Sequence, residues 1–323
     1  MSVNLQRKSL EKLFTLGAVA VLFIVFSLTA NHFFTVKNVL TMALQTSTIT
    51  LMGIGVTFVI ITGGIDLSIG SVIALSGTAS VLLANAGVPF WWAFAAGLLA
   101  GAVCGLGNGL LVTQLRIPPF IATLGTMMML RGIVLTITNA NSSAAPEDFG
   151  DLGNLTLFRV VSPDGPVLFP GISYIVLIMI ASAGVFHFVL KKTRLGRYIY
   201  AIGSNEEASR LSGIRIKPVK LAAYMISGFL AALVGVLLAS RMVTSQPNGG
   251  VGYELSAIAA AVIGGTSLMG GIGTVTGTVL GSFIIGILNT GLTMGGASYF
   301  AQQIVIGAVV ILAVALDQLR HRR

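Results

Sequence analysis

Ten long apolar segments, separated by polar stretches, constrain this 323-residue chain more than any other feature. All but one approach the roughly 20 residues that a helix needs to cross a bilayer. The exception, 255–267, is short and runs into glycines, so we expect a half-helix or a re-entrant element there. The pattern predicts one all-α polytopic membrane domain over 1–323, with about ten transmembrane helices. The segments are 13–30, 39–62, 67–86, 91–113, 120–138, 172–190, 221–240, 255–267, 274–293 and 300–316.

The composition excludes a soluble globular domain. Hydrophobic residues make up 55% of the chain and charged residues 9%, and the mean hydropathy is +0.94. The net charge of +9 does not indicate nucleic acid, because the basic residues lie between apolar runs without interleaved aromatics. The partner that this composition predicts is membrane lipid. Forty glycines are typical of close helix contacts and broken helices.

The basic residues predict the orientation in the membrane, since Lys and Arg concentrate on the cytoplasmic side. With the N-terminus inside, 15 of the 19 fall in inward segments, three (Lys37, Arg159 and Arg241) fall in outward segments, and Arg131 falls within a span. We therefore expect both termini in the cytoplasm. The first apolar segment is either a cleaved signal peptide or a retained helix, and its length favours retention.

Two polar stretches stand out between the spans. The outer one, 139–171, carries Glu147, Asp148, Asp151 and Asp164, and is either a polar linker or an ordered acidic cap facing an external partner. The inner one, 191–220, holds eight of the 19 basic residues and is the largest predicted cytoplasmic segment. We interpret it as a docking element.

Within the inner stretch, residues 204–213 carry the signals of a short helix. Ser204 is a candidate N-cap, Glu207 can reach back to it, and Gly213 suits a left-handed stop. Ala208, Leu211 and Ile214 would supply apolar contacts. Because two turns are unstable alone, this helix needs a surface to pack on. It either lies on the membrane surface or is a lever that a cytoplasmic motor grips.

A single carboxylate, Asp66, lies between the second and third apolar segments in TGGIDLSIGS. A carboxylate at this depth is usually functional or paired. Its place before Leu67 and Ser68 favours a helix cap or hinge over direct substrate contact. The flanking glycines allow the backbone to bend.

A third polar stretch, 246–277, contains Glu254 and a glycine-rich bend with Thr266 and Ser267. Residues 264–271 repeat the pattern GGxxLxxG of residues 63–70, a weak sign of an internal repeat. Without GxxxxGK[ST] the bend does not predict a nucleotide site. An unwound helix lining a translocation path explains it better.

Arg131 lies deep within a span and should face the bundle interior, either to staple helices or to line a path. Uncharged polar residues could pair with it or form a hydroxyl-binding path, although most such residues only bridge helices. The candidates for the path or its gating are Asp66, Ser68, Gln45, Asn108, Arg131, Glu254, Thr266, Ser267 and Asn289.

Enzyme signatures are missing from the sequence. The three histidines are scattered, and there is no HExxH, GxSxG or Cys/His cluster. We therefore expect neither catalysis nor a bound metal or cofactor.

Four stretches together resemble the permease subunits of bacterial ABC importers for simple sugars, within the branched-chain amino acid and ribose type and most closely those for ribose. They are GGIDLSIGS, FIATLGTMMMLRG, RYIYAIGSNEEASRLSGI and GYELSAIAAAVIGGTSLMGG. The resemblance covers the chain from Phe33 onward. It implies a type II ABC importer-like bundle in the bacterial inner membrane, which moves a monosaccharide into the cytoplasm by alternating access.

The resemblance also implies partners. These are a cytoplasmic ATP-binding cassette subunit that holds ATP and Mg, a periplasmic or lipid-anchored sugar-binding protein, and a second permease copy or paralogue. The family's coupling loop matches residues 203–213, where an extra acidic residue shifts the register by up to one position. The implied coupling residues are Gly203, Ser204, Asn205, Glu206, Glu207, Ala208, Arg210, Leu211 and Gly213.

Two other functions follow from different readings of the residues. An ion-coupled secondary transporter would need carboxylates buried in mid-span, of which the sequence offers only the boundary residue Asp66. An intramembrane enzyme would need a paired nucleophile or a metal cluster, and neither is found.

Overall fold

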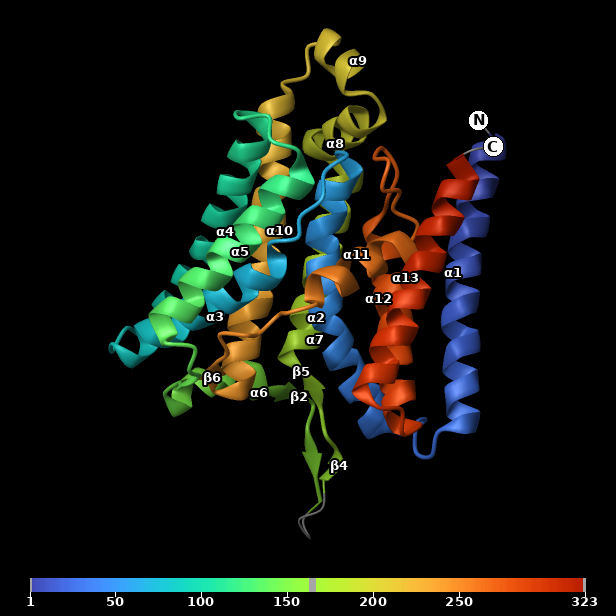
Figure 1. Ribbon diagram of the computed structural model, residues 1–323. Helices are drawn as coiled ribbons and strands as arrows, with labels where there is room; N and C mark the ends of the chain where they lie inside the picture. Colours follow the sequence, from blue (N-terminus) through green and yellow to red (C-terminus); the bar gives the residue numbers. More distant parts are fainter. Residues whose placement is uncertain (1, 163–166, 322–323) are drawn as a thin grey trace.

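The computed structural model describes residues 2–162 and 167–321 and shows a bundle of helices (Figure 1). Each of the ten predicted apolar segments forms a helix. The long and medium helices are α1 (Ser2–Thr29), α2 (Val36–Ile61), α3 (Ile69–Asn85), α4 (Phe90–Thr113), α5 (Pro119–Thr138), α7 (Tyr174–Lys192), α8 (Arg194–Ser204), α10 (Ile216–Met242), α11 (Tyr253–Ile263), α12 (Val275–Met294) and α13 (Tyr299–His321).

Six helices among the described residues are long and apolar enough to cross a membrane: α2, α4, α5, α7, α10 and α12. The prediction of an all-α polytopic membrane protein is therefore confirmed. Four shorter apolar stretches remain in the described part of the chain, namely Thr15–Thr29 of α1, the whole of α3, the whole of α11 and Phe300–Leu312 of α13. Of these, α11 spans only 11 residues. At about 1.5 Å per residue it cannot cross the hydrocarbon by itself.

The buried core is built around α2 and α10. Nearly every residue of α2 from Leu51 to Ile61 is buried, and α10 packs against α2, α3 and α4. Glycines allow the close approach of α4 and α10, since a Cβ on Gly101 would collide with Ala232 and with the Gly228 carbonyl. Small residues at helix interfaces are the usual basis of packing in membranes, where lipid supplies no hydrophobic drive between helices.

Two chain segments turn back into the bundle. After α2 the chain returns through 62–68 before α3 begins, and after α10 it returns from the opposite end through 243–252 before α11 (Figure 1). The starts of α3 and α11 meet inside: a Cβ on Gly70 would collide with the Gly250 carbonyl and the Glu254 carboxylate. We refer to 62–68 with α3, and to 243–252 with α11, as the two re-entrant units.

The two ends of the bundle differ. One end carries α8, the short helix α9 (Glu206–Leu211) and the ends of α1 and α13, and is here termed the α9 end (Figure 1). The opposite end carries short strands, with β1 paired to β6, β2 to β5 and β3 to β4. These small elements are β1 (Ser143–Ala144), η1 (Glu147–Gly150), α6 (Asp151–Asn154), β2 (Thr156–Leu157), β3 (Val160–Val161), β4 (Val167–Phe169), β5 (Ile172–Ser173) and β6 (Thr244–Ser245).

The described part of 139–171 is an ordered cap rather than a simple linker. Phe149 is fully buried, and Ser240 of α10 donates to its carbonyl at 2.6 Å. The Gly153 amide donates to the same hydroxyl at 2.9 Å. Glu147, Asp148 and Asp151 lie in η1 and α6, whereas Asp164 lies outside the described residues.

Candidate functional site

A network of buried polar side chains surrounds Asp66 at the first re-entrant unit. One oxygen of the carboxylate, Oδ1, accepts from the Ser68 amide at 3.0 Å and from the Ser68 hydroxyl at 2.7 Å. The other, Oδ2, accepts from Ser227 of α10 at 2.8 Å, and Asn108 of α4 donates to the Ser68 hydroxyl at 2.7 Å. All four residues are buried. The network joins the start of α3 to two other helices.

Asp66 is not the N-cap of α3. That position belongs to Ser68, whose side chain makes no capping hydrogen bond. Asp66 instead receives the Ser68 amide two residues on, as in an Asx turn, and reaches across to α10. The predicted cap is therefore wrong in detail, because a tertiary partner takes the second carboxylate oxygen. The hydrogen bonds of Asp66 hold the re-entrant turn against α10.

Arg131 on α5 holds the second re-entrant unit. Its Nη1 donates to the Pro247 carbonyl at 2.7 Å and to the Gly249 carbonyl at 2.8 Å. Both carbonyls belong to the returning segment between β6 and α11, whose backbone lacks helix partners there. Charged donors make such bonds stronger than neutral ones. The geometry corresponds to the predicted staple, with Arg131 half-buried against the loop.

Glu254 lies in the first turn of α11, where the helix dipole stabilises a carboxylate. It accepts from the Gly252 amide at 3.2 Å and lies against Gly70 of α3. Glu254 is half-buried. The two re-entrant units thus place Gly70, Gly250 and Glu254 together in the interior.

The remaining predicted path residues are dispersed. Thr266 and Ser267 are buried in the loop after α11, far along the chain from the Asp66 network. Gln45 of α2 is exposed although Thr48 is buried, so these two do not share one environment. Asn289 is half-buried on α12. The structure brings together Asp66, Ser68 and Asn108, and separately Arg131 with the loop that leads to Glu254.

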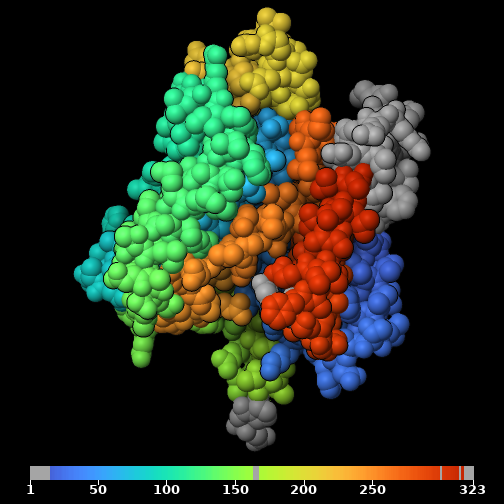
Figure 2. All heavy atoms as spheres, in the orientation of Figure 1, coloured from blue at the N-terminus to red at the C-terminus, as the bar shows by residue number. Residues whose placement is uncertain are grey.

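At the α9 end, α9 stands out from the bundle (Figure 2), whereas α8 buries Ile199 and Ile202 against the core. Only Asn205 separates the two helices, and its side chain accepts from the Ala208 amide at 2.9 Å. Lys220 of α10 contacts Glu206 at 2.6 Å, and Arg210 pairs with Glu207 within α9. Gly213 follows with φ +82°, as predicted for the stop.

Two details of the predicted short helix are wrong. Ser204 is the last residue of α8, so Asn205 and not Ser204 caps α9. Glu207 does not reach back to Ser204, because it pairs with Arg210 within α9. Leu211 is 81% exposed and Ala208 is also exposed, so the surface that this helix needs lies outside the chain, whereas Ile214 is half-buried against the core.

Sequence reasoning missed helix α8 and the polar partner of Asp66. The Thr193 hydroxyl caps α8 by accepting from the Gly196 amide, and Ile199 and Ile202 of this helix are buried. Both the threonine before the helix and the i, i+3 spacing of the two isoleucines are signals that the sequence contains. Sequence reasoning also missed Ser227, whose partner Asp66 is 161 residues away. A serine among apolar residues on one helix gives no signal of such a partner.

The apolar helices, the two re-entrant units and the buried polar network define a polytopic membrane protein of the transporter class. The chain belongs to the family described as branched-chain amino acid transport system / permease component, which matches residues 38–314.

Named relatives agree with this family. The ribose import permease protein RbsC of Escherichia coli (strain K12) is 42% identical over 303 residues, which covers 94% of this chain and 92% of the relative. RbsC of Bacillus subtilis (strain 168) is 41% identical, covering 96% and 93%. The D-allose transport system permease protein AlsC of Escherichia coli (strain K12) is 39% identical, covering 96% and 92%. No solved structure matches the chain.

Proposed function

We propose that this chain is the permease subunit of an ABC importer that moves a monosaccharide, a ribose-like pentose or related simple sugar, across the bacterial inner membrane. The observation that carries the proposal is the identity of about two residues in five with ribose and allose permeases over nearly the whole chain. The helical bundle with broken helices supports it, since discontinuous helices form the midplane sites of many transporters.

The energy for uptake would come from a separate ATPase. The sequence has no nucleotide-binding motif, so ATP and Mg belong to that partner in this proposal. α9 is the element suited to dock it: the helix protrudes from the bundle, and Leu211 presents an apolar side chain that is 81% exposed. An exposed leucine flanked by the Glu207–Arg210 pair fits an apolar groove with a polar rim.

The rest of the assembly follows from the charge pattern and the permease family. We assign the α9 end to the cytoplasm, because residues 191–220 hold eight basic residues, and count about ten spans with both termini inside. The folded cap at the opposite end would then face a sugar-binding protein. A second permease, identical or paralogous, would complete the translocation path.

Within this proposal, alternating access rearranges the two re-entrant units. Their starting helices meet at Gly70, Gly250 and Glu254, and Asp66 and Arg131 each hold one unit in place. Neutral sugars are recognised by hydrogen bonds, which buried hydroxyls and amides can supply once the units separate. Asp66 and Arg131 thereby position the path rather than catalyse a reaction.

The test is co-expression with a tandem-cassette ATPase and a sugar-binding protein from the same genome, followed by ribose uptake in proteoliposomes. We expect the ATPase to co-purify and uptake to require ATP inside the vesicle. Charge reversal at Glu206, Glu207 and Arg210 should abolish the co-purification. Uptake in ATP-free vesicles driven by a sodium or proton gradient would contradict the proposal and favour an ion-coupled transporter.

A further inference from the structure

Three segments that are distant in the sequence meet at the α9 end, and we term this meeting point the glycine junction. It consists of residues 61–64 at the end of α2, residues 200–204 in the last turns of α8, and residues 265–273 after α11. The first and third hold parts of the repeated GGxxLxxG pattern. Folding therefore places the two copies of that pattern against each other.

The junction is built from backbone atoms in direct contact. The Gly271 amide donates to the Ile61 carbonyl at 2.9 Å, which joins the end of the second pattern to the last residue of α2, two positions before the first pattern. Gly203 lies against both of these residues, and a Cβ on Gly203 would collide with the Ile61 carbonyl and the Gly271 amide. Gly270 has φ +86°, and a Cβ there would lie 2.9 Å from the Gly203 carbonyl. No side chain fits at either position.

Tyr200 fastens α8 to the third segment. Its hydroxyl donates to the Gly273 carbonyl at 2.6 Å. Burial raises the pKa of Tyr200 to about 12, so the phenol stays protonated and keeps donating at neutral pH. Ile199 and Ile202 are buried beside it. The last two turns of α8 are thus fixed to the core as well as to the junction.

The junction connects α9 to both re-entrant units. On one side, Asn205 alone links α8 to α9, which leaves little slack between the exposed helix and Gly203. On the other side, Ile61 is followed by the turn that holds Asp66, and Gly265 lies two residues after the end of α11. A displacement of α9 is therefore passed to the first and the second unit at one point.

We propose that Gly203 and Tyr200 are positioning residues that transmit movement of α9 to both re-entrant units at once. The inference rests on the proposed function, in which an ATPase moves α9. Gly203 acts by allowing backbone contact with the end of α2 and with the second glycine pattern, and Tyr200 by keeping α8 and the loop after α11 together. Neither residue needs to touch the sugar.

The experiment uses the complete importer in proteoliposomes, and measures sugar uptake and ATP hydrolysis in the same vesicles. Gly203→Ala and Tyr200→Phe are compared with Gly184→Ala, because Gly184 of α7 has open space around its Cα. We expect Gly203→Ala to bind the ATPase but to raise the ATP hydrolysed per sugar by about threefold to thirtyfold, the range of a modest coupling energy. Tyr200→Phe should shift the ratio in the same direction by less, and Gly184→Ala should leave it unchanged.

An unchanged ratio of ATP to sugar in both variants, even with slower uptake, would overturn the inference, because a purely structural defect lowers both activities together. If Gly203→Ala fails to assemble, Tyr200→Phe decides, since it removes a single oxygen. A wild-type complex without ATP-driven uptake would overturn the proposed function, and this inference with it.

Discussion

At the scale of single residues, Asp66 and Arg131 are charged side chains inside the bundle whose hydrogen-bonding needs are satisfied in different ways. Asp66 accepts three hydrogen bonds from two serines, whereas Arg131 donates to two backbone carbonyls. Each therefore compensates part of the cost of burying a charge in a membrane protein. Each also holds an irregular segment that would otherwise lack partners.

Two substitutions of Asp66 distinguish the effect of its hydrogen bonds on stability from the effect of its charge. Asp66→Asn keeps an acceptor for Ser68 and offers an amide to Ser227, so we expect a purified protein with a slightly lower melting temperature. Asp66→Leu leaves three buried donors without an acceptor, at about 1–3 kcal/mol each, and should fail to purify as a monodisperse species.

The measurement is thermal unfolding in detergent, with size-exclusion chromatography before heating. The exposed Asp148→Leu is the control and should change little. Equal stability of Asp66→Leu and the wild type would show that the network does not brace α3.

Among single residues, the sequence predicted the type of role better than the partner. Arg131 was expected to act as a staple inside the bundle, and it binds the carbonyls of Pro247 and Gly249. Asp66 was expected to cap a helix, but its Oδ2 binds Ser227 of another helix. A carboxylate before a helix start is a local signal, whereas the serine across the bundle becomes a partner only through packing.

At the scale of elements, glycines decide how closely helices approach. Along the face of α4 toward α10, Gly97, Gly101, Gly105 and Gly109 recur every four residues, and a Cβ on any of them would meet atoms of α10. Gly107 on the same helix has nothing within 4 Å. The count of glycines in the sequence predicted such contacts but not which helix they would meet.

This difference gives a matched pair of substitutions. Gly101→Ala should force α4 and α10 apart and lower stability by about 1–3 kcal/mol, the usual cost of overpacking. Gly107→Ala should be neutral or stabilising by up to about 1 kcal/mol, because alanine favours the helix. Melting temperatures of both variants, measured in the same detergent, check the prediction, and a loss of stability in Gly107→Ala equal to that in Gly101→Ala would contradict it.

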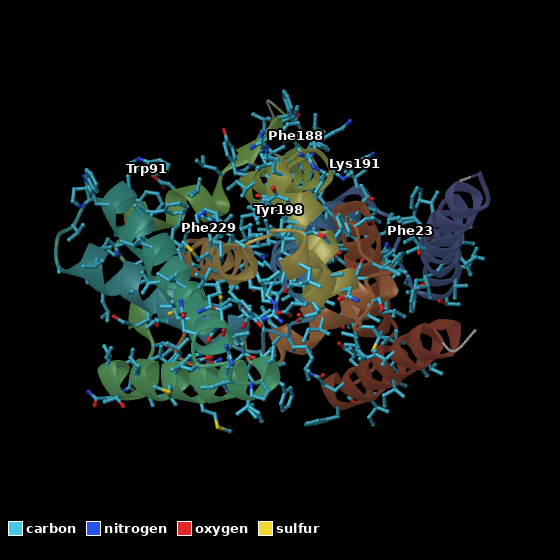
Figure 3. All side chains as sticks on the ribbon, turned by 90° about the horizontal axis from the view of Figure 1, so that it is seen from above. Phe23, Trp91, Phe188, Lys191, Tyr198 and Phe229 are labelled. Carbon is cyan, nitrogen blue, oxygen red and sulfur yellow. The ribbon has the colours of Figure 1, made fainter. Side chains whose placement is uncertain are left out.

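At the scale of the whole molecule, one face of the bundle carries exposed glycines on a membrane helix. α5 lies on this face together with α13, whereas Phe188 and Lys191 of α7 lie on the opposite face (Figure 3). Met129 and Ile133 line a shallow hollow on α5, and Gly125 and Gly132 have open space around them. Exposed small residues on a membrane helix suit contact with another helix.

We therefore expect a second permease copy to pack on α5. Met129→Cys, in a chain with Cys104→Ala, should form a disulfide-linked dimer in native membranes under mild oxidation. Phe188→Cys, on the opposite face and similarly exposed, is the control and should stay monomeric. Cross-linking of both variants to the same extent would indicate random collision, and cross-linking of Phe188→Cys alone would place the interface on α7.

The sequence by itself determined the membrane class, the ten helical segments and the short α11, and it predicts a cytoplasmic place for 191–220, because hydrophobic length and charge are properties of consecutive residues. The tertiary structure alone decided which distant residues meet. It joined Asp66 to Ser227, Arg131 to the loop before α11, and Gly203 to both the end of α2 and the second glycine pattern. The physical reason is that these contacts depend on how closely backbones approach, which no spacing along the chain records.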